Sequence, residues 1–370
     1  MTTTGKQIFT TLESDGTLTV EIAETQFPDP TGNQVLVKME AAPINPSDLA
    51  LLTGPSDLEN AQYSPGKIVA KMPEPFNSGA KGRHGQRLPV GNEGAGEVIA
   101  TGDSDMAKAL LGKRVACVPG TAFSQYAIAD ATMCLPLGDI SAKDGASAFV
   151  NPMTALGFVE TAKAEGAPSI LHTAAASNLG QMLVRICQED GVPLVNIVRR
   201  QEQADILKGM GAENIVNSCD DDFMNQLRGA IDATDAFFGF DPIGGGQMVD
   251  TCFKAMEQVA VKKMSEYSRY GSNQQKKMYI YGRLDLGPTM LTPAYGFGWT
   301  LSGWLLTPFL QNAEMETVLR MRQRVLDNLT TTFKSNYTRE VTLEGMLEKD
   351  AVLQYRQMRT GEKYLVTPWG

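Results

Sequence analysis

The sequence predicts an α/β protein of two domains, one a partly closed β domain and the other built on a doubly wound parallel sheet. Three observations lead to this prediction. The chain has 370 residues, which is too long for one ordinary domain and sufficient for two. Its first part is rich in short strand-like runs between Gly and Pro turns. Its second part alternates strand-length apolar runs with segments of helical spacing, as a parallel sheet requires.

The first part supports the β domain. Strand-like segments occupy residues 20–22, 35–39, 98–100 and 114–118. The pairs Asp15-Gly16 and Gly32-Asn33 are turn signals between such segments. Residues 67–87 are rich in Lys, Gly and Pro and show little periodicity, so we expect a long surface loop there.

The second part supports the parallel sheet. A strand at 169–173 precedes a helix at 177–191, whose apolar residues are Leu179, Met182, Leu183 and Ile186. A second strand at 194–198 precedes a helix at 201–210. Further strands are expected at 215–216, 236–240 and 278–281, and further helices at 249–256 and 315–329. Residues 258–277 interrupt this alternation, and we expect an exposed, mobile insertion.

These patterns set the predicted domain boundaries. The last forty or so residues lose the alternation and should rejoin the first domain. The predicted domains are therefore 1–150 with 311–370, and 151–310.

Composition and charge exclude several classes of partner. The formal net charge is −9, whereas nucleic acids and anionic membranes need a basic face. No apolar run of about 18 residues spans a membrane, and the first residues contain no apolar segment of a secretory signal. The five cysteines include no CxxC pair, so we expect free thiols in a reducing, cytoplasmic compartment.

A dinucleotide site is expected after the first parallel strand, at its carboxyl end. The residues there run Ala174-Ala-Ala-Ser-Asn-Leu-Gly180, which is not the usual GxGxxG pattern. Small side chains still let the backbone approach a pyrophosphate, Ser177 is a natural helix N-cap, and Gly180 permits close helix packing. The candidate phosphate-binding residues are Ala176, Ser177, Asn178, Leu179 and Gly180. The glycine run 244–246 follows a later strand and is interpreted as a turn or a helix start.

Two arginines end the second parallel strand. An acidic residue at this position would bind the ribose 2′-hydroxyl of NAD, whereas Arg favours a 2′-phosphate. Arg199 and Arg200 therefore predict NADP(H) as the cofactor. The alternative is a pair of solvated charges at a strand end.

Four stretches together resemble one known family. They are AAPINPSDLALLTG (41–54), PVGNEGAGEVIATG (89–102), NPMTALGFV (151–159) and TAAASNLGQMLVRICQEDGVPLVNIVRR (173–200). The chain resembles the medium-chain dehydrogenase/reductases, in the zinc-independent branch of quinone oxidoreductases and 2-enoyl thioester reductases. The resemblance implies a GroES-like catalytic domain, a Rossmann cofactor domain and hydride transfer from NADPH. It also implies a homodimer, for which the apolar segment 299–304 is a candidate edge strand.

The resemblance also implies roles for single residues. Asn45 would bind a substrate carbonyl or the nicotinamide side, beside Asp48, although an Asx turn is an equal alternative for Asn45. Thr154 would contact the nicotinamide ribose or phosphate. Tyr281 and Gly282 would end the strand that faces the nicotinamide, and Arg283 would meet a phosphate.

One departure from the branch affects the proton donor. The 2-enoyl thioester reductases carry a catalytic Tyr two residues after the glycine that matches Gly54, and this chain has Ser56 there. Tyr63 is the nearest phenol and becomes the candidate acid if its loop folds back; otherwise water serves.

Three functions therefore stay open. The first is an NADPH-dependent reductase of an activated C=C bond or a quinone, acting on a small molecule with a conjugated carbonyl. The second is an enoyl-thioester reductase, favoured if the basic stretches 67–87 or 258–277 grip a phosphopantetheine or coenzyme A tail. The third is a catalytically silent NADPH-binding protein.

The sequence predicts a protein without zinc. A catalytic zinc in this superfamily needs Cys and His ligands, but Asn92 replaces the His, and Pro43-Ile44-Asn45 stands where the first Cys is expected. His84 lies in the predicted loop and His172 within a predicted strand, so neither is a substitute. Elemental analysis of the dialysed protein should therefore find far less than one zinc per chain. Near-stoichiometric zinc, with activity lost to chelators, would contradict the prediction.

Overall fold

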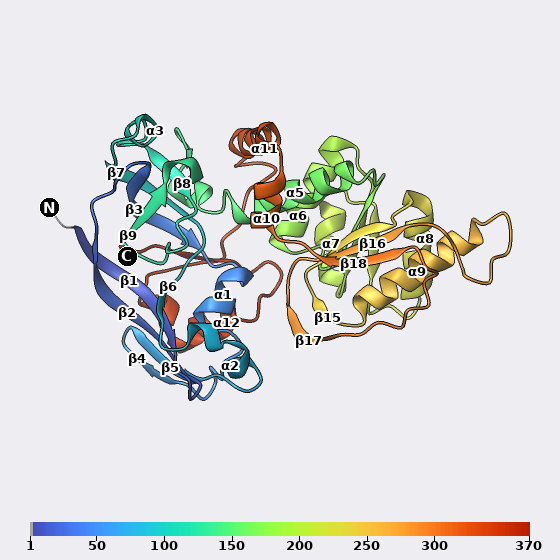
Figure 1. Cartoon of the computed structure of the whole chain (residues 1–370), viewed down its shortest axis with the longest axis horizontal. Helices are drawn as coiled ribbons and strands as arrows, with labels where there is room; N and C mark the ends of the chain where they lie inside the picture. The colour runs from blue at the N-terminus through green and yellow to red at the C-terminus, as the bar shows by residue number, and fades with distance from the viewer. Residues whose placement is uncertain (1–2) are drawn as a thin grey trace. The chain divides into compact units, whose positions relative to one another are not determined.

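The computed structural model describes residues 3–370, which fold into two compact units. One unit comprises the chain up to Val150 together with Arg322–Gly370, and the other comprises Asn151–Met321. The second division falls within helix α11 (Met315–Asp327), beyond the position 310/311 expected from the sequence. Figure 1 labels the elements of both units.

The first unit contains two sheets. The five-stranded sheet has the order β4-β5-β2-β1-β6, and the seven-stranded sheet has the order β10-β8-β7-β3-β20-β19 with β9 paired to β3. The strands of the first sheet are β1 (Thr3–Leu12), β2 (Thr17–Phe27), β4 (Gln62–Ser64), β5 (Lys67–Lys71) and β6 (Arg87–Pro89). Those of the second are β3 (Gln34–Pro43), β7 (Gly94–Thr101), β8 (Arg114–Cys117), β9 (Tyr126–Asp130), β10 (Cys134–Pro136), β19 (Arg339–Val341) and β20 (Tyr364–Val366).

Local signals and packing both explain these strands. The β1–β2 hairpin turns at Gly16, whose φ of 84° favours glycine, and Asp15 accepts the Thr17 N–H at 2.8 Å. Alternating residues of the strands, including Ile8, Leu18, Val37 and Val98, form a single buried core. Because the sheets are not closed on themselves, the partly closed β domain predicted from the sequence is confirmed.

The helices of this unit are short. They are α1 (Pro46–Leu52), α2 (Phe76–Gly79), η1 (Lys81–Arg83), α3 (Asp105–Lys108), η2 (Ala131–Met133), α4 (Ala142–Gly145), η3 (Gly345–Leu347) and α12 (Lys349–Tyr355).

The predicted surface loop 67–87 is wrong in part. It contains β5, which pairs antiparallel with β2, as well as α2 and η1. Ile68 and Ala70 of β5 are buried between lysines at both ends of the strand. The short alternation of Lys, Ile, Val and Ala was outweighed in the sequence by the surrounding Pro and Gly residues.

The second unit is built on a six-stranded parallel sheet with the order β13-β12-β11-β14-β16-β18. Its strands are β11 (Ile170–His172), β12 (Leu194–Val198), β13 (Asn214–Asn217), β14 (Phe238–Asp241), β16 (Lys276–Ile280) and β18 (Trp299–Gly303). A separate parallel pair joins β15 (Gly244–Gly246) to β17 (Asp285–Thr289). This order is the doubly wound order 3-2-1-4-5-6, so the predicted fold class is confirmed.

The remaining helices belong to this unit, apart from the first residue of α5 and the last residues of α11. They are α5 (Val150–Ala164), α6 (Asn178–Asp190), α7 (Gln201–Gly209), α8 (Phe223–Thr234), α9 (Met248–Lys262), α10 (Leu306–Asn312) and α11. Helix α6 buries Leu179, Met182, Leu183 and Ile186, the four residues expected from their spacing. It ends at Gly191, whose φ is 65°.

Two local expectations in this unit need correction. Of the predicted mobile insertion 258–277, the first residues continue α9 as far as Lys262, and Lys276 begins β16. Lys276 is buried because its ammonium group pairs with the Glu257 carboxylate at 2.7 Å. The glycine run 244–246 is not a plain turn but the short strand β15, which ends two residues before α9 begins.

The edge of the parallel sheet is β18. It pairs with β16, beside which it runs in Figure 1, and with no other strand of the described chain. Most of its residues are exposed or half-buried. Within residues 3–370, no helix combines the length and apolar character needed to cross a bilayer.

Candidate functional site

The loop between β11 and α6 is made of small residues and leads into a capped helix. Ser177 caps α6, because its hydroxyl oxygen accepts the Gly180 N–H at 3.1 Å. A side chain at residue 180 would clash with the Ala175 carbonyl, so this position requires glycine. Ala174 has a φ of 51°, a left-handed conformation that glycine usually supplies. Ala176 and Leu179 are buried, and Asn178 is half-buried on the first turn.

This loop lies at the switch point of the parallel sheet. Strands β12 and β13 continue from β11 on one side, whereas β14, β16 and β18 continue on the other. Dinucleotides bind in the crevice that such a reversal creates at the carboxyl ends of the strands. The helix N-terminus, the small side chains and the tight Gly180 contact therefore fit a pyrophosphate at this position.

Arg199 and Arg200 follow β12 directly, and both side chains are exposed. Their backbone N–H groups donate to Gln203 Oε1, at 3.0 and 3.2 Å, so the amide side chain fixes the turn into α7. Neither guanidinium group lies within ion-pair distance of a carboxylate in residues 3–370. Both groups are thus available to a phosphate.

Tyr281 differs from its expected role. Its hydroxyl is hydrogen-bonded to His172 Nε2 at 2.8 Å, and its ring packs against Phe158. The hydroxyl and the ring are therefore both engaged inside the unit, and only the backbone at this position is left for a cofactor. Gly282 is close-packed, because an added Cβ would lie 2.7 Å from the Pro242 carbonyl oxygen, and Arg283 is exposed.

Two other predicted residues of this unit are buried. Thr154 lies on α5 and is almost fully covered. His172 ends β11 and is fully buried, as expected of a strand residue. Burial lowers the pKa of His172 to about 3, so the imidazole is neutral.

The first unit has its own polar cluster around the start of α1. Asn45 caps the helix, and the Asp48 carboxylate accepts the backbone N–H groups of Asn45 at 2.8 Å and of Asn92 at 2.7 Å. Asn92 Nδ2 donates to Ser47 Oγ at 2.9 Å. The residue that replaces the metal-binding His is thus hydrogen-bonded to α1.

Glu93 determines how the Asn45 amide is oriented. Its Oε1 accepts the Asn45 Nδ2 group at 2.8 Å, and its Oε2 accepts the N–H groups of Phe149 and Val150, each at 2.9 Å. A carboxylate only accepts, so the Asn45 nitrogen must face it. Asn45 is 1% exposed, and its Oδ1 has no hydrogen-bond partner among residues 3–370. The free atom is an acceptor, which disfavours the expected contact with a substrate carbonyl.

A buried lysine completes the cluster. Lys363 is 8% exposed, and its ammonium group donates to Ser147 Oγ at 2.9 Å. Ser147 Oγ is hydrogen-bonded in turn to the Tyr337 hydroxyl at 2.7 Å. Burial lowers the pKa of Lys363 to about 8, against the attraction of Glu93 and Asp48. Burial raises the pKa of Asp48 to about 7, and it raises that of Glu93 as well.

Tyr63 does not join this cluster. Its hydroxyl donates to the Leu58 carbonyl at 2.8 Å, and no hydrogen bond or ring contact within residues 3–370 links it to Asn45. Ser56, which stands where a catalytic Tyr is found in the enoyl reductases, is buried, and its hydroxyl has no partner among these residues. The catalytic role of Tyr63 therefore gains no support.

Residues 3–370 contain no group of three or more His, Cys, Asp or Glu side chains arranged to hold a metal ion. His84 is half-buried, and its Nε2 is hydrogen-bonded to the Asn77 side chain at 3.1 Å. The absence of zinc remains a prediction, to be tested by elemental analysis. The five cysteines are free, and four of them are buried.

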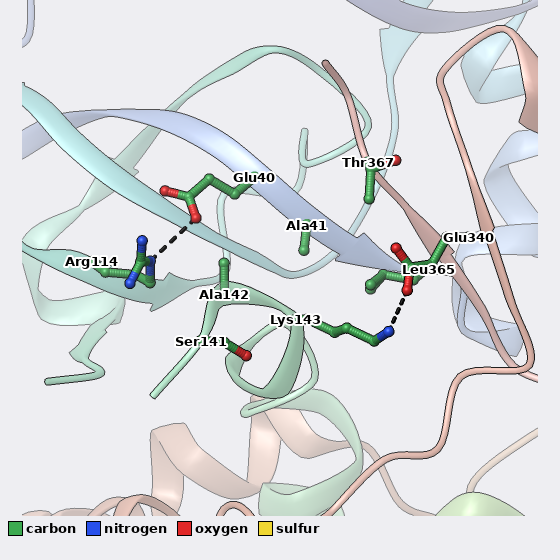
Figure 2. A pocket seen from close by; sticks show the side chains of 9 residues that line it. All are labelled: Glu40, Ala41, Arg114, Ser141, Ala142, Lys143, Glu340, Leu365 and Thr367. Atoms are coloured by element: carbon green, nitrogen blue, oxygen red, sulfur yellow. Dashed lines mark hydrogen bonds and ion pairs between the residues drawn. The ribbon is translucent and has the colours of Figure 1, made fainter. Parts of the chain in front are cut away.

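A surface pocket of about 280 Å³ in the first unit contains none of the predicted site residues. It is lined by Glu40, Ala41, Arg114, Ser141, Ala142, Lys143, Glu340, Leu365 and Thr367 (Figure 2). Arg114 pairs with Glu40 at 3.2 Å, and Lys143 pairs with Glu340. Because its charges neutralise one another, we assign no ligand to this pocket.

Sequence reasoning missed two residues of these sites. Lys363 lies far along the chain from Glu93, and no local pattern predicts that a lysine will be buried. Asp241 follows a strand in the segment FDPIGGG, and an acidic residue after a parallel strand was a signal that could have found it.

Replacement of Lys363 should reveal its partnership with Glu93. Lys363→Met removes a buried cation that attracts Glu93 and Asp48 without direct contact, which should lower the free energy of unfolding by about 1–3 kcal/mol at pH 7.5. The pKa of Glu93 is already raised and should rise further in the variant. The loss should therefore be largest above that pKa and shrink as the carboxyl is protonated at pH 5. Urea unfolding at both pH values measures it.

Lys349→Met is the matched control, because Lys349 is exposed, donates to the Glu59 carbonyl and lies over the Tyr63 ring, without a buried carboxylate partner among residues 3–370. Adding Glu93→Gln to Lys363→Met should recover part of the loss. A loss that is independent of pH, or equal to that of Lys349→Met, would contradict the pairing.

Comparison with known proteins agrees with this geometry. Residues 31–139 match the alcohol dehydrogenase GroES-like domain family. The human mitochondrial enoyl-[acyl-carrier-protein] reductase is 28% identical over 209 residues, which are 53% of this chain and 48% of that protein. Mouse prostaglandin reductase-3 is 26% identical over 191 residues, 51% of this chain and 44% of that protein. The match thus spans about half the length of the curated relatives.

Two solved structures share the whole fold. A proposed NADPH:quinone reductase of Mesorhizobium loti is 25% identical with a TM-score of 0.75, covering 99% of this chain and 98% of that one. Escherichia coli quinone oxidoreductase in complex with NADPH has a TM-score of 0.69 at 16% identity, covering 98% of this chain and 100% of that one. The sequence motifs, the matched domain and the shared fold agree: the chain contains a GroES-like domain of the alcohol dehydrogenase type, and as a whole it is similar to the quinone oxidoreductases and enoyl reductases of the medium-chain dehydrogenase/reductase superfamily.

Proposed function

We propose that the protein is an NADPH-dependent oxidoreductase that transfers a hydride to an activated C=C bond or a quinone. One observation supports NADPH as the cofactor. Two exposed arginines, which have no carboxylate partner among residues 3–370, follow β12, and the neighbouring strand β11 leads into the small-residue loop at the switch point. The names of the relatives support the reaction class, since they include quinone and enoyl reductases.

The polar side chains around Asn45 are engaged with one another, which suits a substrate that conjugation already activates. Hydrogen bonds join Asn92 to Asp48 and Ser47, and join Glu93 to Asn45. These side chains therefore bind one another and do not point at a common centre. Conjugation lowers the barrier to hydride attack at carbon without a metal Lewis acid. A small quinone or enone fits this chemistry.

An enoyl-thioester reductase is the second candidate, supported by the named enoyl reductases. The charges of the two basic stretches weigh against it. Lys67 pairs with Glu21 at 3.5 Å, Lys71 with Asp15 at 3.6 Å and Lys277 with Glu165 at 2.6 Å. Cations engaged in this way are less available to a phosphopantetheine or coenzyme A tail. Ser56, in place of a catalytic Tyr, weighs in the same direction.

A panel of matched substrates tests the proposal. NADPH oxidation is followed with a small quinone, an enone and the enoyl thioester of the same carbon skeleton. Turnover of the quinone or enone, with less of the thioester, supports the leading function. Preference for the thioester selects the second candidate, and no turnover despite NADPH binding selects the catalytically silent protein.

Arg199 is proposed to select NADPH over NADH. A guanidinium gains charge-assisted hydrogen bonds from a 2′-phosphate, each worth about 1.5–3 kcal/mol. Arg199→Ala should therefore raise the Michaelis constant for NADPH about tenfold or more, since about 1.4 kcal/mol is a factor of ten. The constant for NADH should change little, because NADH lacks that phosphate.

Lys208→Ala, which removes an exposed cation from α7, is the control for a general change in charge. Equal losses with both cofactors would make Arg199 structural. Discrimination by Arg200→Ala alone would transfer the role to Arg200, because neighbouring side chains point in different directions. A wild-type preference for NADH would overturn the cofactor assignment.

We also propose a homodimer that forms through β18. This strand leaves one side of its backbone unpaired within the described chain, and such edges are covered in stable proteins. Light scattering over a dilution series should give twice the chain mass of 40.0 kDa at micromolar concentration. A monomer mass throughout the series would reject the dimer.

A cytoplasmic location remains a prediction from composition. Free cysteines suit a reducing compartment. Mitochondria are the alternative, since several relatives are named as mitochondrial.

A further inference from the structure

Asp241 is a buried carboxylate whose hydrogen bonds join two loops. It is the last residue of β14 and is 1% exposed. Its Oδ2 accepts the Gly244 N–H at 2.7 Å, and its Oδ1 accepts the hydroxyl of Thr173. Thr173 is fully buried and immediately precedes the loop that leads to α6.

The two loops lie on opposite sides of the switch point. Thr173 follows β11, and Gly244 follows β14; these strands are neighbours, and the strand order reverses between them. A dinucleotide in this crevice crosses from the β12 side to the β14 side. One side chain therefore connects both walls of the crevice.

The loop after β14 has little freedom to move independently. The Tyr281 N–H donates to the Asp241 carbonyl at 3.0 Å, and Leu284 N–H donates to the Pro242 carbonyl at 3.0 Å. A side chain at Gly244, whose φ is 78°, would lie 2.8 Å from the Gly282 carbonyl oxygen. The hydrogen bonds of Asp241 thus connect the rigid segment after β14 to Thr173, where the loop between β11 and α6 begins.

Burying the Asp241 carboxylate costs desolvation free energy. Burial raises the pKa of Asp241, opposed by the hydrogen bonds from Thr173 and Gly244. An apolar side chain of similar size would avoid this desolvation, so the carboxylate is explained by the donors that it brings together.

We propose that Asp241 is a positioning residue for the dinucleotide cofactor. Through Thr173 and Gly244 it sets the distance between the two loops that flank the pyrophosphate and the nicotinamide half. The inference rests on the proposed NADP(H) cofactor and goes beyond it, because it separates the contributions of the two halves of the cofactor. The adenosine half, next to Arg199, should be bound independently of Asp241.

Direct binding measurements test this role. The dissociation constant of NADPH is measured by fluorescence titration, and that of 2′,5′-ADP, which represents the adenosine half, by calorimetry. Asp241→Ala should raise the constant for NADPH about tenfold, equivalent to about 1.4 kcal/mol, and leave that for 2′,5′-ADP nearly unchanged.

Two milder variants keep the test valid if Asp241→Ala folds poorly. In Asp241→Asn, the amide oxygen can accept the Gly244 N–H while the amide nitrogen donates to the Thr173 oxygen, so NADPH binding should stay close to that of the wild type. Thr173→Val removes one of the two donors with little change in shape, and should weaken NADPH binding without weakening 2′,5′-ADP binding.

Asp250→Ala is the matched control. Asp250 is also a buried carboxylate of this unit, but its partners are Tyr295, Thr292 and Lys254, and neither Thr173 nor Gly244 donates to it. Asp250→Ala should lower the melting temperature and leave both dissociation constants unchanged.

Two results would overturn the positioning role while the proposed cofactor stands. One is wild-type affinity for NADPH in both Asp241→Ala and Thr173→Val. The other is an equal loss of NADPH and 2′,5′-ADP binding in these variants, which indicates a general structural effect. If the wild-type chain binds 2′,5′-ADP and NADPH only at millimolar concentration, the proposed function fails, and this inference fails with it.

Discussion

A carboxylate that leaves water must be given hydrogen-bond donors, and both candidate sites depend on this constraint. In the first unit, Glu93 takes its donors from Asn45, Phe149 and Val150. In the second unit, Asp241 takes its donors from Thr173 and Gly244. The donors to Glu93 are all distant from it in sequence, whereas Asp241 has one distant donor, Thr173, and one local donor, Gly244. Each buried carboxylate therefore joins segments next to a candidate site: Asn45 in the first unit and the loop after Thr173 in the second.

The two carboxylates are balanced differently. Glu93 has a buried cation nearby in Lys363, which is itself hydrogen-bonded to Ser147. The negative charge on Glu93 can therefore persist in the core, and it keeps the Asn45 nitrogen facing inward. Asp241 has hydrogen-bond donors but no cation acting on it within residues 3–370, so hydrogen bonds alone offset the free-energy cost of burying its charge.

The orientation of the Asn45 amide bears on how a substrate carbonyl could be bound. A free Oδ1 accepts hydrogen bonds, whereas stabilisation of a developing enolate needs donors. With the Tyr63 hydroxyl engaged by Leu58, neither residue expected to act on the carbonyl is arranged to donate to it. The contacts of Asn45 and Tyr63 therefore leave the proton donor unassigned.

The sequence by itself determined the fold class, the division near residue 150 and the small-residue loop between β11 and α6, because these depend on local periodicity and on small residues next to a strand. Ser177 and Gly180 could be identified in this way, since a helix cap and a close helix contact are local requirements. Only the tertiary structure decided that Lys363 is buried near Glu93, that Asp241 bonds to Thr173, and that Tyr281 faces His172. Each of these contacts joins residues brought together by strand order, and a one-dimensional pattern carries no information on which distant side chains share a buried space.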